Sequence, residues 1–365
     1  MQNIIYLSAF TVFQALCSTL TALLIGLPAA FFTAKRNFIG KKFLLSLSSV
    51  PFCVPSLLIA LAFVSCFGIS GLLNSIIKFF APDNYSPVAL LYSFSGIIIA
   101  QGFYNFPLVM KSINDSWKQI PEETAETARL LGAGEWKVFR TITIHQLMPS
   151  IASSCMLVFL YCYFSFMIIL LFGSVGCSTL EVEVYKAAKI TLDFKYAFYL
   201  GSLETLLACI FVAFYSLLEN KSFKIQGQTF SNHSAAANIS SLSEKFFAFI
   251  IFSLIFVFFI APLLSILYNA VSSKNDFLTL KNISHIIQMK GFFKALFTTF
   301  FCAVSTGFCS SVLAFLYAVY IRTKDPFSKN LFFRILPMIP LAVSGVILGI
   351  LITVIVRKGN IILLI

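Results

Sequence analysis

Charged residues are scarce in this sequence. Asp, Glu, Lys and Arg make up 11% of the 365 residues, hydrophobic residues make up 59%, and the mean hydropathy is +0.93. A soluble globular domain carries about 25% charged residues, so this composition excludes a soluble domain and indicates an integral membrane protein. The net charge of +12 therefore does not indicate a nucleic-acid partner, because basic cytoplasmic loops explain most of it in a membrane protein.

The motifs of catalysis and of metal binding are also missing. There is no GxxxxGK[ST] phosphate-binding loop, so any ATP hydrolysis must come from a partner. The nine cysteines form no CxxC pair and lie almost entirely within apolar runs, which argues against a disulfide framework or a metal site. The three histidines, His145, His233 and His285, share no helical face. We expect no catalytic residue, no cofactor and no bound metal.

Long apolar runs are what the sequence has instead. A membrane-spanning helix needs about 20 mostly apolar residues, and these runs lack the period-two alternation of membrane barrels. We therefore expect an all-α, polytopic membrane protein with about eight transmembrane helices. The runs lie near residues 7–33, 44–68, 88–113, 147–173, 196–218, 246–271, 292–321 and 331–356.

A polar stretch divides these runs into two blocks. Residues 219–244 are rich in Ser, Asn and Ala and show no hydrophobic period, which is typical of a flexible linker. The first block, residues 1–218, holds about five of the expected helices. The partial second block, residues 245–365, holds about three.

The second block repeats part of the first. In each block an apolar helix ends in a basic loop, and the next helix begins with a pair of prolines. The pairs are Pro51 with Pro55 and Pro337 with Pro340. Internal duplication is common in transporters, whose substrate sites lie at the interface of the repeats.

The interval from Ile120 to Pro149 is the longest polar interval between two apolar runs. Pro121 suits the first position of a helix, and Gly132 can take the left-handed conformation that ends one. A second helix is expected from Glu135, so the interval predicts two short helices around a glycine turn. The larger share of Lys and Arg lies on the side of this loop (114–149), which is therefore expected to be cytoplasmic, with the N-terminus outside.

This loop resembles the Glu-Ala-Ala loop of bacterial ABC importer permeases. The matching residues are Glu126-Thr127-Ala128, Gly132 and Ile142-x-Ile144, with Thr127 in place of an alanine and His145 in place of a proline. In that family the loop docks in a groove of a separate ATPase subunit. The resemblance therefore implies an ATPase-coupling loop that includes Glu122, Glu126, Thr127, Ala128, Arg129, Gly132 and Gly134.

Much of the chain resembles the fused, two-repeat permeases of bacterial importers for iron(III) and thiamine. The matching stretches are Val50–Asn74, Ser95–Pro149, Phe164–Ala188 and Leu336–Leu351. The resemblance implies a multi-pass protein of the bacterial inner membrane that receives a small solute from a periplasmic binding protein. It also implies alternating access driven by the ATPase. The resemblance does not identify the transported solute. Iron(III) and thiamine are the leading candidates, and the permeases of polyamine, sulfate and molybdate importers have the same loop motif.

Proline and polar residues within the spans are candidates for the translocation path. They are Pro51, Pro55, Gln101, Asn105, Pro107, Glu204, Pro337 and Pro340. The alternative is structural: a proline can kink a helix for packing, and a polar side chain can hydrogen-bond to a neighbouring helix. For Glu204 the structural alternative is a carboxylate that stays near water or pairs with a lysine.

Two other classes of function stay open at this point. A secondary transporter or channel would also need many helices and a repeat, and a remnant of a permease could bind partners without transporting anything. The spacing of the repeat places the residue of the second block that corresponds to Glu126 beyond Ile365. It also places the opening helix of the first block before Met1. We therefore expect part of a longer permease, or a chain that needs a companion polypeptide.

Overall fold

The structure is a computed structural model in which two compact units are distinguished. Unit 1 comprises residues 1–262 and 340–365, and unit 2 comprises residues 263–339. The described residues are 4–80, 87–173, 177–223, 237–238, 241–272, 279–324, 336, 343–345, 347–349 and 352. Pro337 and Pro340, both candidates for the translocation path, lie outside them.

The described residues are almost entirely helical, which confirms the all-α prediction. Six helical stretches among them are long and apolar enough to cross a membrane. They are Ile4–Lys35, Ser56–Phe80, Glu135–Tyr163, Phe194–Tyr215, Leu242–Val271 and Phe292–Lys324. The more polar α6 (Phe94–Trp117) corresponds to the run expected at 88–113, and most of the run at 331–356 lies outside the described residues.

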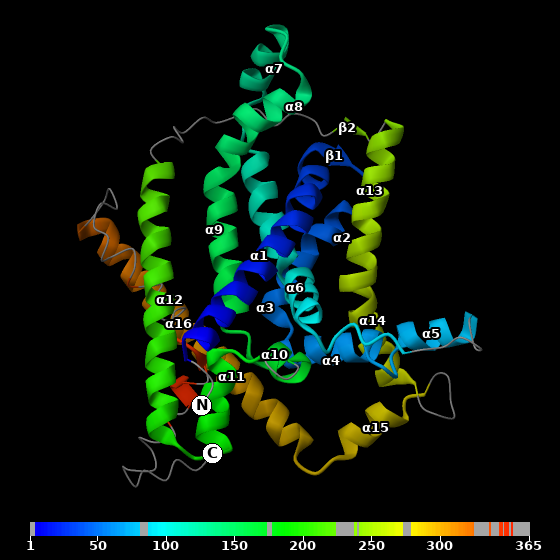
Figure 1. Ribbon diagram of the computed structural model, residues 1–365, viewed down its shortest axis with the longest axis vertical. Coiled ribbons are helices and arrows are strands. Elements are labelled where there is room, and N and C mark those ends of the chain that lie inside the picture. Colours follow the sequence, from blue (N-terminus) through cyan, green and yellow to red (C-terminus); the bar gives the residue numbers. More distant parts are fainter. Residues whose placement is uncertain are drawn as a thin grey trace. The chain divides into compact units, whose positions relative to one another are not determined.

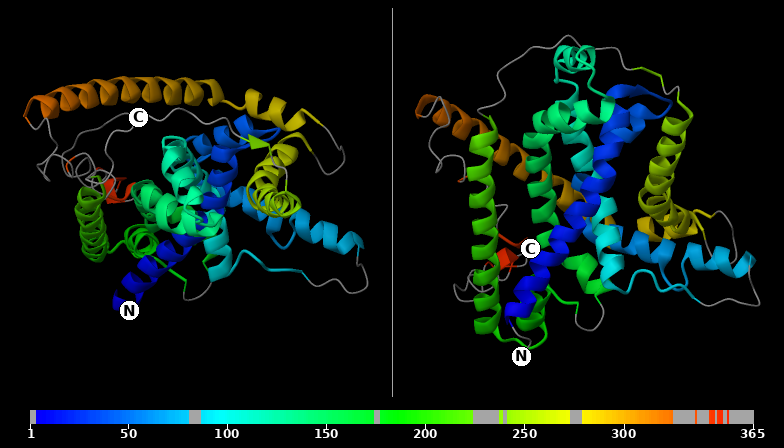
Figure 2. Two further views of the ribbon diagram at one scale, coloured as in Figure 1. Left: turned by 90° about the horizontal axis from the view of Figure 1, so that it is seen from above. Right: turned by 45° about the horizontal axis from the view of Figure 1, so that its top comes forward.

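The centre of unit 1 is a parallel pair of long helices, α1 (Ile4–Lys35) and α6. The two helices are in contact along their length and run in the same direction. Phe13 stacks on Phe94 near one end of the pair, and Phe31 packs against Trp117 near the other. Small residues let the helices approach closely, because a Cβ atom on Gly102 would lie 2.6 Å from the Thr21 side chain. Figures 1 and 2 show the two helices side by side in each view.

Two further helices extend this bundle. The antiparallel α9 (Ile144–Tyr163) packs on both α1 and α6, and α12 (Phe194–Phe223) packs on α9. The direction of α9 follows from its contacts, because the Gln14 amide of α1 donates to the carbonyl oxygen of Cys162, near the end of α9 (2.9 Å). The alternating helix directions agree with a topology in which consecutive spans cross the membrane in opposite senses.

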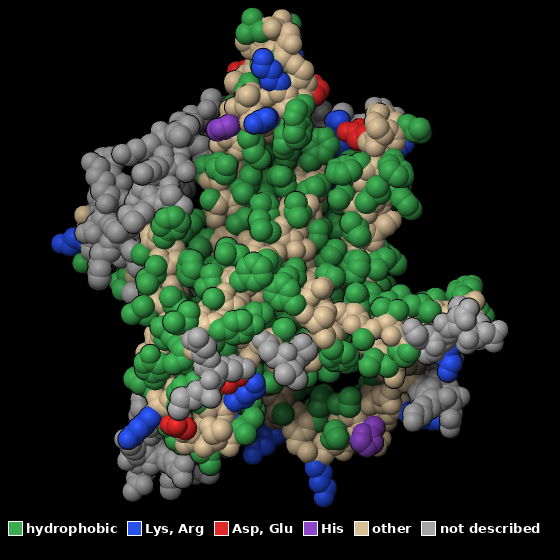
Figure 3. Space-filling view, in the orientation of Figure 1, with side chains coloured by type: hydrophobic (Ala, Val, Ile, Leu, Met, Phe, Trp, Pro, Cys, Tyr) green, Lys and Arg blue, Asp and Glu red, His purple; other side chains and the backbone are tan. Residues whose placement is uncertain are grey.

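The two ends of unit 1 differ in character. One end carries α7 (Glu122–Leu130), α8 (Glu135–Val138) and the π-helical turn η2 (Phe139–Thr143), which leads into α9. The opposite end carries α10 (Phe166–Phe172) and α11 (Leu180–Lys189). Figure 1 shows α7 and α8 projecting beyond the long helices, and in Figure 3 charged side chains lie on this projection while hydrophobic ones cover the helices below.

The run expected as one helix at 44–68 is broken into short pieces. They are α2 (Lys41–Ser46), the 3-10 turn η1 (Leu47–Ser49), α3 (Val50–Cys53) and α4 (Ser56–Phe67). Between α3 and α4, Val54 is extended (φ −98°, ψ 121°) and Pro55 follows it. Proline lacks an N–H group and disfavours a helical residue before it, so Pro55 accounts for the break. Beyond α4, the short helix α5 (Leu72–Phe80) completes this region.

The described part of the linker between the blocks pairs with the end of the first span. The two-residue strand β2 (Ala237–Asn238) pairs in parallel with β1 (Arg36–Asn37) at the end of α1. Arg36 also forms an ion pair with Glu244 (2.6 Å) in the first turn of α13 (Leu242–Ile255). The π-helical turn η3 (Phe256–Ile260) continues α13, and Phe258 of this turn stacks on Phe103 of α6.

Unit 2 is built from helices with little burial. It contains most of α14 (Ala261–Val271), with α15 (Lys281–Gln288) and α16 (Phe292–Lys324). None of the residues of α15 or α16 is buried. The apolar residues of α16 are thus on its surface, as expected of a helix that meets lipid.

The contact between α1 and α6 predicts the effect of a larger side chain at Gly102. Gly102→Val should lower the free energy of unfolding by about 1–3 kcal/mol, because the added atoms have no space against Thr21. Thermal unfolding of the purified protein in detergent measures the loss. Gly307→Val in α16 is the matched control, since nothing lies within 4 Å of its new Cβ atom; equal losses at both positions would contradict the packing account.

Candidate functional site

Helices α7 and α8 and the turn between them form a hairpin that projects beyond the long helices, and this hairpin begins with a proline. Pro121 stands at the N-cap of α7 (φ −63°, ψ 131°), whereas the sequence predicted it at the first helical position, which Glu122 occupies. Within α7, the Thr127 hydroxyl donates to the carbonyl oxygen of Glu123 (2.7 Å). Glu126 and Thr127 are exposed, and Ala128 is half-buried. Helix α7 therefore presents the acidic residue of the motif to the surroundings.

Glycine closes α7 as predicted. Gly132 has φ +85°, the left-handed conformation that other residues adopt at a cost. Its N–H donates to the carbonyl oxygen of Arg129 (2.9 Å), and the N–H of Ala133 donates to that of Ala128 (3.0 Å). These two bonds are those of a Schellman motif, which satisfies the last carbonyl groups of a helix. Gly134 then leads into α8 with an ordinary extended backbone (φ −66°, ψ 158°).

A salt bridge joins the two arms of the hairpin. The Arg129 guanidinium donates to both carboxylate oxygens of Glu135, at 2.7 and 3.1 Å. Both side chains are largely exposed, so the pair sets the geometry of the turn more than it stabilises the fold. Arg129 is thus an internal brace of the candidate coupling loop.

The tip of the hairpin exposes large apolar side chains that the sequence motif does not include. Leu130, Leu131 and Trp136 are 88%, 85% and 73% exposed. Exposed apolar residues gathered at one place mark an interaction surface. Their sequence signal was present, because two leucines directly precede the helix-ending glycine in an otherwise polar loop.

Aromatic rings connect the hairpin to the bundle. Trp136 of α8 stacks on Phe139 of η2 (5.7 Å between ring centroids), and Phe139 stacks on Trp117 at the end of α6 (6.1 Å). Trp117 in turn packs on Phe31 of α1 (5.7 Å). We refer to these four rings as the aromatic ladder.

The ladder borders a cavity of about 820 Å³ that also reaches the Arg36–Glu244 ion pair. Basic groups gather at this end of the unit. Burial, and then the neighbouring Lys118, lower the pKa of Lys41, whose ammonium group donates to the carbonyl oxygen of Arg36 (2.9 Å). This end therefore offers positive charge, aromatic surface and the projecting hairpin together.

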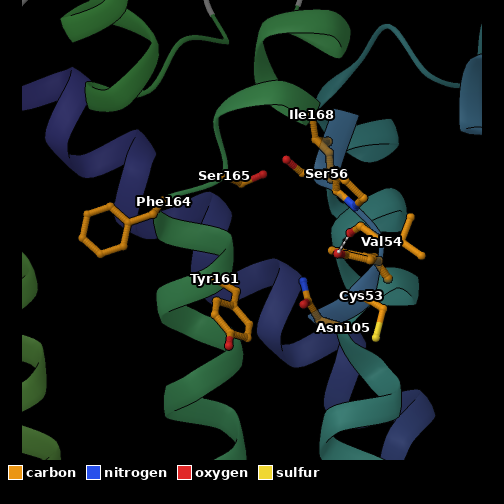
Figure 4. A pocket seen from close by; sticks show the side chains of 10 residues that line it. Cys53, Val54, Ser56, Asn105, Tyr161, Phe164, Ser165 and Ile168 are labelled. Carbon is orange, nitrogen blue, oxygen red and sulfur yellow. Dashed lines mark hydrogen bonds between the residues drawn. The ribbon is translucent and has the colours of Figure 1, made fainter. Parts of the chain in front are cut away.

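A second cavity, of about 440 Å³, lies between two interrupted helices. One interruption is the break at Val54–Pro55, and the other separates α9 from α10 at Phe164–Ser165. The lining residues are Cys53, Val54, Pro55, Ser56, Tyr104, Asn105, Tyr161, Phe164, Ser165 and Ile168. Figure 4 shows Ser56 and Ser165 facing each other at one side of this cavity, with Asn105 and Tyr161 at the other.

The candidates for the translocation path separate in the structure. Asn105 and Pro55 line the cavity between the interrupted helices. Gln101 instead accepts a hydrogen bond from Ser18 of α1 (2.7 Å), and Pro107 is buried within α6. Pro51 belongs to α3.

Glu204 is buried elsewhere, beside another carboxylate. It is fully buried on α12, neither carboxylate oxygen has a hydrogen-bond partner among the described residues, and the Glu181 carboxylate of α11 interacts with it electrostatically. Glu181 is 3% exposed and accepts a hydrogen bond from Ser344 (2.7 Å). Burial raises the pKa of Glu181 well above the usual range of a carboxyl group. No local sequence feature indicated this burial, because balanced charges surround Glu181.

Three comparisons relate this chain to known proteins. The family model for the binding-protein-dependent transport system inner membrane component matches residues 22–224. The thiamine transport system permease protein ThiP of Haemophilus influenzae is 31% identical over 280 residues, which cover 74% of this chain and 49% of that protein. The putative 2-aminoethylphosphonate transport system permease protein PhnU of Salmonella typhi is 30% identical over 216 residues, which cover 55% of this chain and 75% of that protein. The chain thus spans about half the length of the H. influenzae relative.

A solved structure shares the fold. It is a bacterial alginate ABC transporter in complex with an alginate pentasaccharide-bound periplasmic protein. The matched chain has a TM-score of 0.51 and 16% sequence identity, and the match covers 62% of the present chain and 82% of the other.

The left-handed turn of the hairpin predicts a position-dependent effect of serine. Gly132→Ser should destabilise the hairpin by about 1–2 kcal/mol, because a Cβ atom strains the left-handed conformation. Hydrogen exchange of the backbone amides of residues 122–138 should then accelerate. Gly134→Ser is the matched control, since its backbone is extended and serine is a favourable N-cap. Similar exchange in both variants would refute the role of Gly132.

Proposed function

The chain belongs to the family of binding-protein-dependent transport system inner membrane components, and we propose that it is a permease subunit of an ATP-binding-cassette importer. In this proposal a periplasmic binding protein delivers a small solute to the outer side of the bundle. A separate ATPase subunit binds the α7–α8 hairpin on the cytoplasmic side. Alternating access then moves the solute inward, and no residue of this chain performs covalent catalysis.

The hairpin is the observation that carries this proposal. It projects beyond the long helices and exposes Glu126 beside the apolar tip formed by Leu130, Leu131 and Trp136. A carboxylate next to apolar side chains suits a protein groove that offers a basic residue and an apolar floor. Glu122, Thr127 and Ala128 belong to the same proposed contact, while Gly132, Gly134 and the Arg129–Glu135 brace hold its shape.

The aromatic ladder supports a mechanical role for the hairpin. Rings packed from Trp136 to Phe31 join the tip to the ends of α6 and α1, so a displacement of the hairpin would act on both helices. Tyr104 and Asn105 of α6 line the cavity between the interrupted helices. We therefore infer that movement of α6 links ATPase binding to the shape of that cavity.

Thiamine is the cargo that we propose, with iron(III) second. The support for thiamine is the similarity to the H. influenzae permease ThiP, which extends over 74% of this chain. The similarity to the 2-aminoethylphosphonate permease covers a smaller share of the chain, 55%. For iron(III) the support is the resemblance of sequence motifs.

Secondary transport is a different candidate function, favoured by one observation. Secondary transporters carry ionisable residues within their spans, and Glu204 lies buried beside Glu181. Uptake by such a transporter would follow an ion gradient and would need no ATPase. Uptake that stops when the ATPase is inactivated, while the ion gradients are intact, separates the importer from this alternative.

Removing the motif carboxylate should weaken binding of the ATPase subunit. Glu126→Ala should lower its recovery on the purified chain about tenfold or more, because a charged hydrogen bond is worth roughly 1.5–3 kcal/mol. Quantitative co-purification with the ATPase subunit of the same organism measures the effect. Glu123→Ala, an exposed position on the same helix, is the matched control. The coupling role of Glu126 would be excluded by equal recovery from wild type and Glu126→Ala.

A further inference from the structure

The described residues that line the cavity between the interrupted helices include no Asp, Glu, His, Lys or Arg. Its lining combines serine, asparagine and tyrosine with aliphatic and cysteine side chains, in a volume of about 440 Å³. Sites for small organic ligands have volumes of about 300–1,000 Å³ and a few polar groups in apolar walls. The cavity therefore suits a small organic group that needs no countercharge from these residues.

The Asn105 amide supplies a directed acceptor. Its nitrogen Nδ2 donates to the carbonyl oxygen of Gln101 (3.0 Å), which fixes the amide orientation because the reverse would bring two acceptors together. The oxygen Oδ1 has no donor among the described residues, and Asn105 is 3% exposed. A buried acceptor without a donor is unfavourable, so a ligand that presents an N–H group would satisfy it.

The surfaces around Asn105 favour a planar ligand. The side chain of Tyr161 stands beside Asn105 in Figure 4, and its ring offers a face for stacking. Val54 and Ile168 add apolar wall, and the Ser56 and Ser165 hydroxyl groups lie across the space. The Tyr104 hydroxyl donates to the carbonyl oxygen of Val54 (2.8 Å), which holds it at the wall.

The same lining is unsuited to iron(III). Hard cations bind to carboxylates and other oxygen ligands, and iron in proteins is also held by imidazole. No Asp, Glu or His is among the described residues that line the cavity, so its side-chain oxygen atoms belong to amide, hydroxyl and phenol groups. A bare trivalent ion could gain compensating charge here only by displacing a phenolic proton, and the Tyr104 hydroxyl already donates its proton to the carbonyl oxygen of Val54.

We propose that this cavity binds a planar heteroaromatic ring bearing an amino N–H donor, with the donor on Asn105 Oδ1 and the ring beside Tyr161. This assignment rests on the proposed importer function and specifies the class of its cargo. The aminopyrimidine ring of thiamine has this chemistry, whereas 2-aminoethylphosphonate and iron(III) do not. The charged thiazolium ring of thiamine would lie toward the open side of the cavity.

Cys53 provides a test in the unmodified full chain. This cysteine is exposed and lines the cavity, so a ligand in the cavity should slow its alkylation by N-ethylmaleimide. Cys209 on α12 is exposed outside the cavity lining and is the internal control. Peptide mass spectrometry of the detergent-purified chain reports both rates with thiamine, the free aminopyrimidine, 2-aminoethylphosphonate or redox-inert gallium(III).

Thiamine and the aminopyrimidine should each protect Cys53 and leave Cys209 unprotected. Asn105→Leu should raise the concentration for half-protection about tenfold, since it removes one buried hydrogen bond. If Asn105→Leu does not fold, Ser56→Leu takes its place, because an exposed serine becomes a side chain that fills the cavity. Ser202→Leu, an exposed serine of α12, is its matched control and should bind as wild type does.

The proposal is overturned if neither thiamine nor the aminopyrimidine protects Cys53. Stronger protection by gallium(III) or 2-aminoethylphosphonate than by the aminopyrimidine would also overturn it, and so would unchanged binding in both cavity variants. The proposed function has a separate readout. If the ATPase still binds through Glu126 while Cys53 is unprotected, the cargo assignment fails and the importer function stands.

Discussion

The backbone of a membrane helix must satisfy its own hydrogen bonds, and the rest of this structure depends on that constraint. An interrupted helix frees N–H and C=O groups, which lipid cannot satisfy, so interruptions are tolerated inside protein or beside a polar cavity. Two such interruptions in the described part of unit 1, at Val54–Pro55 and at Phe164–Ser165, border one cavity. In the proposed importer, the positions of the broken helices therefore define where a polar solute is held within an apolar bundle.

Helix α6 connects this cavity to the α7–α8 hairpin. Asn105 lies at the cavity and Trp117 at the aromatic ladder, roughly 18 Å apart at 1.5 Å per residue. Close packing of α6 on α1 through Gly102 leaves little room for independent movement of the two helices. A contact at the hairpin would thus displace α1 and α6 as a rigid pair. The short, interrupted helices beside the cavity would then change position.

The sequence predicted the features that depend on local chemistry. Apolar length predicted the helical class, Gly132 predicted the left-handed turn, and Pro55 indicated a distorted second span. The break at Phe164–Ser165 was not predictable, because neither proline nor glycine marks it and tertiary packing overrides the apolar run. The burial of Glu181 was not predictable either. Three lysines lie near it in the sequence, so the segment was interpreted as exposed and balanced in charge. Its hydrogen-bond partner, Ser344, is distant in the sequence. The cavity was not predictable for the same reason, because residues that are distant in the sequence line it together.

The central claim is that the α7–α8 hairpin contacts an ATPase subunit, and crosslinking tests it most directly. A photoreactive amino acid at Leu131, on the exposed apolar tip, is irradiated in membranes that contain the ATPase and the binding protein. The same group at Ile190, 69% exposed at the end of α11, serves as the comparison at the opposite end of unit 1. The account predicts a crosslink to the ATPase from position 131 and none from position 190. A crosslink from position 190 without one from position 131 would contradict it.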